Sequence, residues 1–480
     1  MFKVFKNGLL NLINQSKRKH FFYIFSLIIL ALFSSFHINV DSAWIHALSL
    51  HPNNFTNFFG IYDFWSLGPF YYGYPPLEAT FTILTSPIQF LFGNSWGPHV
   101  FDESINGYYY LYLKNGTIFN NNSLFIYGFL TKVSFFVYAF NKISSLLDEK
   151  SYFIWLLNPA IILIGASMKF NDAMCASILL ISLFYLYSNQ ERKFYFFLFI
   201  AFFLKTTSLL IFIPLLLLIF NKNKLDFIIL VLIYSIVKFS LEFPFNLHSD
   251  TYSLMNSLNF WQREGIHYGF KVLQRFGGME IGWTFTTFSY CILSLYIIIK
   301  KIEFDLKNFI FFSLVYLIIY YLGAGAPWNR WGIIILPFFI FFNIIFDYRN
   351  KNFLLILWSF DLVISNYLYL HLHKGYISGS ELYTNYIFYT YPFNFDFDYI
   401  YRENFTPMRV FELYDQFHNA LNLFIVVNCF FIHKNNKKLK IIRDIKPYLN
   451  KNFVLITYLS CFIIFSVLTK FYAEKYFEPF

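Results

Sequence analysis

Residues 21–38, FFYIFSLIILALFSSFHI, decide what kind of fold this chain can adopt. The stretch contains no Asp, Glu, Lys or Arg. A helix that crosses the hydrocarbon core of a bilayer needs about 20 mostly apolar residues. Stretches of this kind recur along the chain, so the sequence predicts an all-α polytopic membrane protein.

The composition excludes the soluble classes. Hydrophobic residues make up 57% of the 480 residues, charged residues make up 13%, and the mean hydropathy is +0.49. A soluble domain carries about 25% charged residues. Four cysteines lie in apolar runs, which is typical of small buried side chains rather than of disulfides or metal ligands. Soluble domains, intrinsic disorder and a disulfide scaffold are therefore excluded.

The sequence predicts about thirteen spans, and one apolar segment is set apart from them. Residues 77–92 contain Glu78 and Pro87, so we interpret them as a helix on the membrane surface. The two short spans around Lys205 form either a bent pair or a re-entrant hairpin. The predicted spans are 21–38, 124–141, 151–168, 172–188, 194–206, 208–220, 226–244, 283–299, 308–324, 331–347, 352–370, 419–432 and 453–469.

Charge bias sets the orientation of these spans. Cytoplasmic loops hold the excess of Lys and Arg. With the N-terminus inside, most of the 37 basic residues fall in short inner segments, so the net charge of +10 is a topology signal rather than a nucleic-acid site. Three long outer segments remain, at 39–123, 245–282 and 371–418. We divide the chain into a module at 1–244, an outer loop at 245–282 and a second helical module at 283–480.

The first outer segment carries two notable features. Asp41 follows the first span almost immediately, and a carboxylate at a bilayer boundary is costly unless it is solvated or paired. It is either a solvated loop acid or a general base at an outer cavity. Tyr74-Pro75-Pro76-Leu77 follows, and its prolines would stiffen a turn and start the surface helix.

Together these features resemble the GT-C glycosyltransferases, in particular the dolichol-pathway glucosyltransferases and the GPI-type or archaeal mannosyltransferases. The segment from Lys169 to Asp172 resembles the family's short outer turn with a carboxylate. Lys205 lies in a stretch that resembles its leucine-lysine turn, and Arg330 resembles its basic motif at the top of a late helix. The resemblance covers residues 20–215 best and is loose after 245. It implies that 1–244 is a GT-C-like module and that 283–480 is a variable C-terminal helical module.

The resemblance implies transfer of a monosaccharide, with mannose or glucose expected, from a polyprenyl or dolichyl phosphate sugar. The acceptor would be a lipid-linked glycan or a protein on the outer or lumenal face, and the displacement would be single and inverting. An acceptor hydroxyl needs a carboxylate to take its proton, and Asp41 is our choice of base, with Asp172 orienting it or the acceptor. Asp172 alternatively caps a helix.

The leaving phosphate gains charge, which cations near the outer boundary would stabilise. Arg330 and Lys205 rank first among them, and snorkelling is the alternative for each cation. The further candidates are Lys169, Arg263, Lys271 and Arg275.

No cofactor is expected, and nucleic acid is not a partner. Some members of the family use a divalent cation, for which Asp41 and Asp172 would be ligands, but most of the lipid-phosphate branch do not. A flippase or transporter for a lipid-linked saccharide is the alternative function, and a buried pair of Lys132 with Asp361 would favour it. A non-enzymatic membrane scaffold is a third reading. The composition favours a prokaryotic plasma membrane, with the ER membrane as the eukaryotic equivalent.

Overall fold

The described part of the structure is almost entirely helical. Every element in these residues is an α-, 3-10 or π-helix, and they contain no strand, which confirms the all-α fold for this part of the chain. The computed structural model describes residues 15–36, 58–60, 75–85, 129–146, 155–167, 171–249, 285–323, 332–346, 351–372, 407–435, 452–461 and 463–464.

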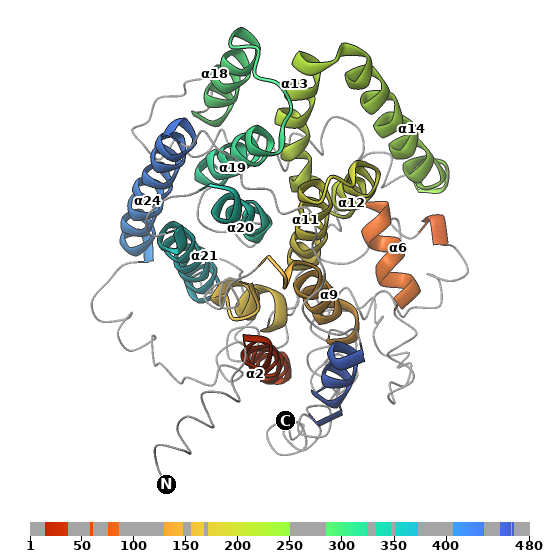
Figure 1. The fold of residues 1–480 in the computed structure, drawn as a ribbon, viewed down its shortest axis with the longest axis vertical. Helices are drawn as coiled ribbons and strands as arrows, with labels where there is room; N and C mark the ends of the chain where they lie inside the picture. The colour runs from red at the N-terminus through yellow and green to blue at the C-terminus, as the bar shows by residue number, and fades with distance from the viewer. Residues whose placement is uncertain are drawn as a thin grey trace, which may run out of the picture.

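Most elements coincide with the apolar runs of the sequence (Figure 1). The first half contains α2 (Gln15–Phe36), η1 (Phe58–Gly60), α6 (Pro76–Thr85), η4 (Phe129–Val133), α9 (Ser134–Ile143), η5 (Ile161–Ser167), α11 (Asn171–Tyr187), α12 (Glu191–Leu204), η6 (Thr206–Ile211), α13 (Phe212–Lys222) and α14 (Lys224–His248). The second half contains α18 (Phe285–Ile299), α19 (Leu306–Gly323), α20 (Leu336–Ile345), α21 (Lys351–Leu372) and α24 (Pro407–Asn435), and a further helix runs over Asn452–Cys461.

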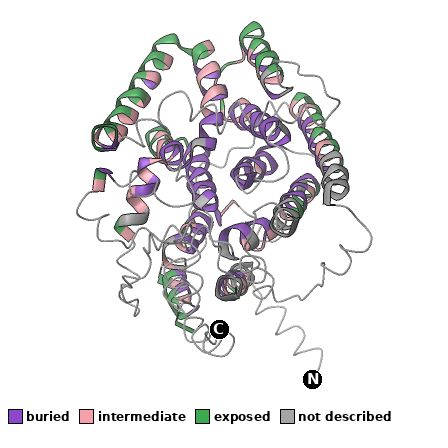
Figure 2. Ribbon diagram, turned by 180° about the vertical axis from the view of Figure 1, so that it is seen from behind, coloured by how far each residue is buried: buried purple, intermediate pink, exposed green. Residues whose placement is uncertain are grey.

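The core lies where α11, α19 and α20 meet. Almost every described side chain of these helices is buried, whereas the helices around them are exposed along one side (Figure 2). These helices are apolar on all sides, so they can be buried on all sides. The residues that the core surrounds are consequently shielded from the medium outside the protein.

The peripheral helix α14 shows the opposite pattern. Its exposed residues include Leu232, Ile236 and Phe239, all more than half exposed. Exposed apolar surface on this scale marks contact with a membrane or with a partner. Within the described residues, α14 is the one helix long and apolar enough to cross a membrane, and shorter apolar helices of 10–17 residues accompany it.

The connection between α11 and α12 is a tight turn. Asn189 adopts a left-handed conformation with φ 57°, which Asn tolerates better than most residues. Around it the backbone N–H of Gln190 donates to the carbonyl oxygen of Tyr185 at 2.8 Å, closing the end of α11. The two helices therefore form an antiparallel hairpin that returns the chain to the level at which α11 began.

Helix ends that the charge pattern assigns to the inner side contact one another. The ring of Phe194, at the start of α12, lies 5.6 Å from that of Phe309, at the start of α19. The Asn221 amide, near the end of α13, donates to the carbonyl oxygen of Ile297 at 2.9 Å. These contacts join segments far apart in the sequence at one end of the helices.

The beginning of one helix differs from expectation. The helix α24 begins at Pro407, so residues 407–418 of the predicted outer segment 371–418 are helical. At Lys205 the backbone is extended (φ −148°, ψ 121°), and the 3-10 helix η6 follows before α13 begins. The two short predicted spans correspond to two helices, α12 and α13, with a break at Lys205, which is compatible with the predicted bent pair. Of the apolar segment 77–92, residues 77–85 are helical and belong to α6, and the rest lies outside the described residues; its position on the membrane surface stays a prediction.

Candidate functional site

The proline motif forms the beginning of α6. Pro76 is the first residue of the helix, where its missing N–H costs nothing. The carbonyl oxygen of Pro75 accepts the first helical hydrogen bond, from the N–H of Ala79 at 3.1 Å. Glu78 lies in the first turn and is fully buried. The helix packs against α12 and α14, and the burial of Glu78 keeps its carboxylate out of open solvent.

Asp172 and Lys205 form a buried ion pair. The Lys205 Nζ lies 3.4 Å from Asp172 Oδ1, and the two side chains are 11% and 1% exposed. Asp172 is in the first turn of α11 and Lys205 directly follows the last residue of α12, so each charge opposes the partial charge of its helix end. The α11–α12 hairpin brings these ends together, which places two predicted site residues in one contact. Because α11 begins at Asn171, Asp172 is not its N-cap.

Further polar groups surround the ion pair. Cys175, one turn along α11, lies within electrostatic range of Asp172, Lys205 and Glu78. The Ser208 hydroxyl donates to the carbonyl oxygen of Ala201 at 2.8 Å. Glu78 therefore belongs to the same neighbourhood as the ion pair, and the sequence analysis did not name it as a site residue. An acid in the first turn after two prolines, within an apolar segment, was the available signal.

This arrangement provides an ammonium group and carboxylates at the ends of helices. A lysine ammonium has three N–H donors, so it can contact more than one acceptor at a time. In a buried site its charge would act on an anion more strongly than in water. Among the described residues, no group of three or more His, Cys, Asp or Glu side chains could hold a metal ion.

Most of the other predicted site residues fall outside the described ranges. This applies to the proposed base and to all but one of the phosphate-binding candidates, so these assignments stay predictions. They are Asp41, Tyr74, Lys169, Arg263, Lys271, Arg275 and Arg330.

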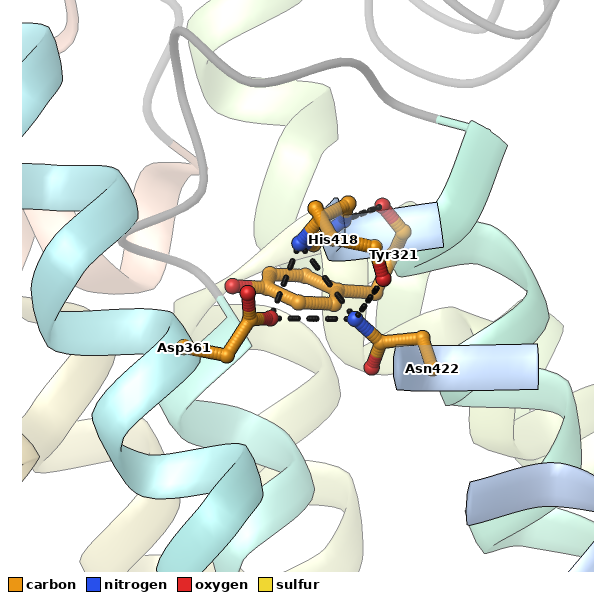
Figure 3. Close-up of polar contacts among 4 residues, drawn as sticks. All are labelled: Tyr321, Asp361, His418 and Asn422. Carbon is orange, nitrogen blue, oxygen red and sulfur yellow. Dashed lines mark hydrogen bonds and ion pairs between the residues drawn. The ribbon is translucent and has the colours of Figure 1, made fainter. Parts of the chain in front are cut away.

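A second buried polar cluster joins α19, α21 and α24 (Figure 3). Nδ1 of His418 lies 2.8 Å from Oδ2 of Asp361, and both side chains are at most 1% exposed. The Asn422 amide donates to the same oxygen at 3.0 Å and to the carbonyl oxygen of His418 at 2.9 Å. Nε2 of His418 lies 3.4 Å from the carbonyl oxygen of Tyr321. The sequence analysis named Asp361 but neither His418 nor Asn422.

The charges predicted inside spans have specific surroundings. The contacts shown for Asp361 are to His418 and Asn422, whereas the transport hypothesis had linked it to Lys132, which is buried in η4. Lys238 pairs with Glu242 one turn along α14. Asp361 and Glu242 therefore each have a described polar partner.

The C-terminal end of α24 carries a third group of interest. The ring of His433 stacks on Phe311 with centroids 4.0 Å apart, and its Nε2 lies 3.2 Å from Oδ1 of Asn308. Burial, together with the nearby Lys307 ammonium, lowers the pKa of His433 to about 4. Burial also lowers the pKa of Lys307. His433 is thus neutral at neutral pH.

Comparison with known proteins leaves these sites to be interpreted by their own chemistry. No family model, curated protein or solved structure matches the chain.

Proposed function

We propose that the protein is a multi-pass membrane protein of about thirteen spans with its N-terminus in the cytoplasm. Apolar side chains on the outside of α14 and buried ionisable pairs inside suit a bilayer, where charges face the interior of the bundle. The contacts of Phe194 with Phe309 and of Asn221 with Ile297 join ends assigned to the same side. The pair of Asp172 with Lys205 does the same at the opposite side.

The function that we propose is transfer of a monosaccharide from a polyprenyl or dolichyl phosphate sugar. The acceptor is a lipid-linked glycan or a protein on the outer or lumenal face, and Asp41 is the base of an inverting single displacement. One observation carries the proposal: α6, Asp172 and Lys205, which the sequence selected separately for their resemblance to the GT-C glycosyltransferases, meet in one buried neighbourhood. Lys205 supplies the cation for the donor phosphate, and Arg330 is expected to supply a second.

The test is a transfer assay in membranes with a radiolabelled polyprenyl phosphate mannose or glucose. Asp41→Asn should abolish transfer, because the amide cannot accept the proton of the acceptor hydroxyl. Asp63→Asn, in the same outer segment, serves as the matched control and should retain transfer. Activity of the Asp41 variant at the wild-type level would remove the proposed base.

The donor-binding role is tested separately. Arg330→Gln should raise the KM for the lipid phosphate sugar and leave the KM for the acceptor nearly constant, because it removes a forked phosphate contact. Arg330→Lys should recover part of the loss. Unchanged donor kinetics in the Gln variant would contradict the assignment.

A second candidate is a flippase or transporter for a lipid-linked saccharide. The pair of Asp361 with His418 favours it, because ionisable residues inside membrane segments commonly mark transport pathways and proton relays. Purified protein in liposomes distinguishes the two functions. Movement of a labelled lipid-linked sugar across the bilayer without formation of a glycosidic bond would support transport and exclude transfer.

A further inference from the structure

Two lysine side chains meet at one tyrosine ring near the ends of three helices. The Lys142 Nζ, near the end of α9, lies 5.6 Å from the centroid of the Tyr185 ring, and the Lys193 Nζ, in the first turn of α12, lies 5.2 Å from it. Tyr185 belongs to the last turn of α11 and is buried. Because α11 packs against both α9 and α12, two positive charges from separate helices come to the same place.

The groups that contact these two ammonium groups are aromatic rings and hydroxyls. Lys142 also lies 5.4 Å from the ring centroid of Tyr138, one turn before it on α9, and it interacts with the hydroxyl groups of both tyrosines. The ring of Phe197, one turn beyond Lys193, is stacked on that of Tyr185 with centroids 5.4 Å apart. An aromatic face attracts a cation but carries no net charge. These contacts therefore position the two positive charges without neutralising them.

Neither lysine is paired with a carboxylate of the described residues. The polar partner of Lys193 is the neutral side-chain oxygen of Gln190, at 2.8 Å. Arg192 and Glu191 are exposed in the same turn of α12, so one acid accompanies three cations there. The acids of the stretch 148–150, which follows α9 in the sequence, lie outside the described residues. The cluster is therefore a positively charged surface at the level of the turn between α11 and α12.

Other lysines show that aromatic partners belong to one side of the predicted topology. Lys205 and Lys238 pair with carboxylates instead. In the part of the chain that the structure describes, every lysine over an aromatic ring falls in a short segment that the charge bias assigns to the inner side. These are Lys142, Lys193, Lys222, Lys224 and Lys307. Among these described lysines, two share a ring at Tyr185, which distinguishes this cluster from the rest.

The ligand that fits this cluster is an anion with apolar chains attached. A lysine ammonium has three N–H donors on a flexible four-carbon stem, so two of them can turn toward one phosphate group. Apolar surface adjoins the charges, because Tyr138 on α9 and Phe196 on α12 are 44% and 60% exposed. Basic pockets between membrane helices on the cytoplasmic side bind the headgroups of anionic lipids. A soluble phosphate would gain the charge contacts alone.

We propose that Lys142, Lys193 and Tyr185 form a binding site for the phosphate group of an anionic phospholipid. The two ammonium groups contact the phosphate, Arg192 adds positive charge from the exposed side, and the acyl chains lie along α9 and α12. The site goes beyond the proposed transferase and would serve either candidate function. Its assignment to the cytoplasmic leaflet rests on the proposed orientation of the spans.

Native mass spectrometry of the full chain in neutral detergent micelles tests the site by titration with phosphatidylglycerol. The variant Lys142→Gln/Lys193→Gln should weaken the tightest binding event about thirtyfold, because each cation near an anionic membrane surface contributes about 1 kcal/mol. The matched control Lys222→Gln/Lys224→Gln removes the same charge from another exposed inner segment and should leave this affinity nearly unchanged. Equal losses in the two variants would overturn the proposal, because total charge and not the cluster would then bind the lipid. Micelles have no leaflets, so this result does not depend on the orientation of the spans or on transferase activity.

A second arm uses the wild-type protein and decides even where the glutamine variant does not fold. Lysines are acetylated with an amine-reactive reagent, with and without phosphatidylglycerol, and the rates are measured by peptide mass spectrometry. Bound lipid should slow the acetylation of Lys142 and Lys193 severalfold relative to that of Lys222 and Lys224 in the same molecules. Unchanged relative rates would overturn the site. Glycerol 3-phosphate, a soluble phosphate without acyl chains, should not protect at the same concentration, and equal protection by it would overturn the assignment to a lipid.

Discussion

Replacement of Lys205 by Met should strongly destabilise the protein. Methionine retains the unbranched shape of the lysine stem but removes the ammonium group that lies 3.4 Å from Asp172. The Asp172 side chain is 1% exposed, so water cannot replace the lost contact without a rearrangement of the surrounding helices.

The magnitude follows from the geometry. Two unit charges 3.4 Å apart attract by about 5 kcal/mol at an effective dielectric constant of about 20. The cost of removing the ammonium from water on folding offsets part of this attraction. Removal of one partner from a buried pair typically costs about 3–5 kcal/mol, because the other charge stays buried. We expect Lys205→Met to fall in this range, with a smaller loss for Lys205→Arg, which keeps the charge.

The assay is equilibrium unfolding in mixed micelles, with a double-mutant cycle. The variant Asp172→Asn/Lys205→Met carries neither charge, so it should be more stable than Lys205→Met alone, with a coupling free energy of about 2–3 kcal/mol. Equal stability of the single and double variants would refute the reasoning, because the buried carboxylate would then carry no cost. A Lys205→Met variant as stable as the wild type would refute it as well.

Three further predictions concern other parts of the fold. Because the pKa of His433 is lowered to about 4, the unfolded state binds more protons than the folded state between about pH 6.5 and 4, so the free energy of unfolding should fall as the pH drops through this window. The variant His433→Gln should reduce this slope in a series of unfolding curves measured at different pH values. Gly165→Ala should lower the free energy of unfolding by about 1–3 kcal/mol, because the new Cβ would lie 2.5 Å from the ring of Phe136. Adding Phe136→Leu should recover part of this loss in thermal unfolding, and a Gly165→Ala variant of full stability would contradict the packing. Asn158→Ala should cost about 1–2 kcal/mol, because its amide donates to the Ser359 hydroxyl at 2.8 Å and its oxygen accepts from the start of the following helix; Ser359→Ala should cost less, and the reverse order in denaturant curves would contradict the assignment.

Hydrophobic runs predicted those helices whose ends are marked by polar or charged residues. The runs that became α11 and α12 end at polar residues, and their predicted limits agree with the structure to within a few residues. The beginning of α24 was missed, because residues 407–418 include Arg409, Glu412 and Asp415, and the low hydropathy of such a segment is typical of a loop. Pro407 at the first position was the available signal, since proline favours the start of a helix.

The candidate sites were predictable to different degrees. Alternation of the spans placed Asp172 and Lys205 at the same side, and the tight turn at Asn189 explains why they meet. The partners of Asp361 could not be found in this way, because the contact with His418 depends on how α21 and α24 cross. That crossing is determined by packing in three dimensions and not by the spacing of residues along either helix.

In the multi-pass topology that we propose, the hairpin of α11 and α12 has a consequence for biogenesis. A translocon that released the two segments one at a time would expose a bare aspartate and then a bare lysine to lipid, and each costs about 2.5–3.5 kcal/mol at the centre of a segment and less toward its ends. Because Asp172 and Lys205 lie at the open end of one hairpin, the two segments can leave together as an electrically neutral unit. Ribosome-stalled chains that end shortly after Lys205 should therefore integrate α11 less efficiently when Lys205 is replaced by Glu than when it is replaced by Arg.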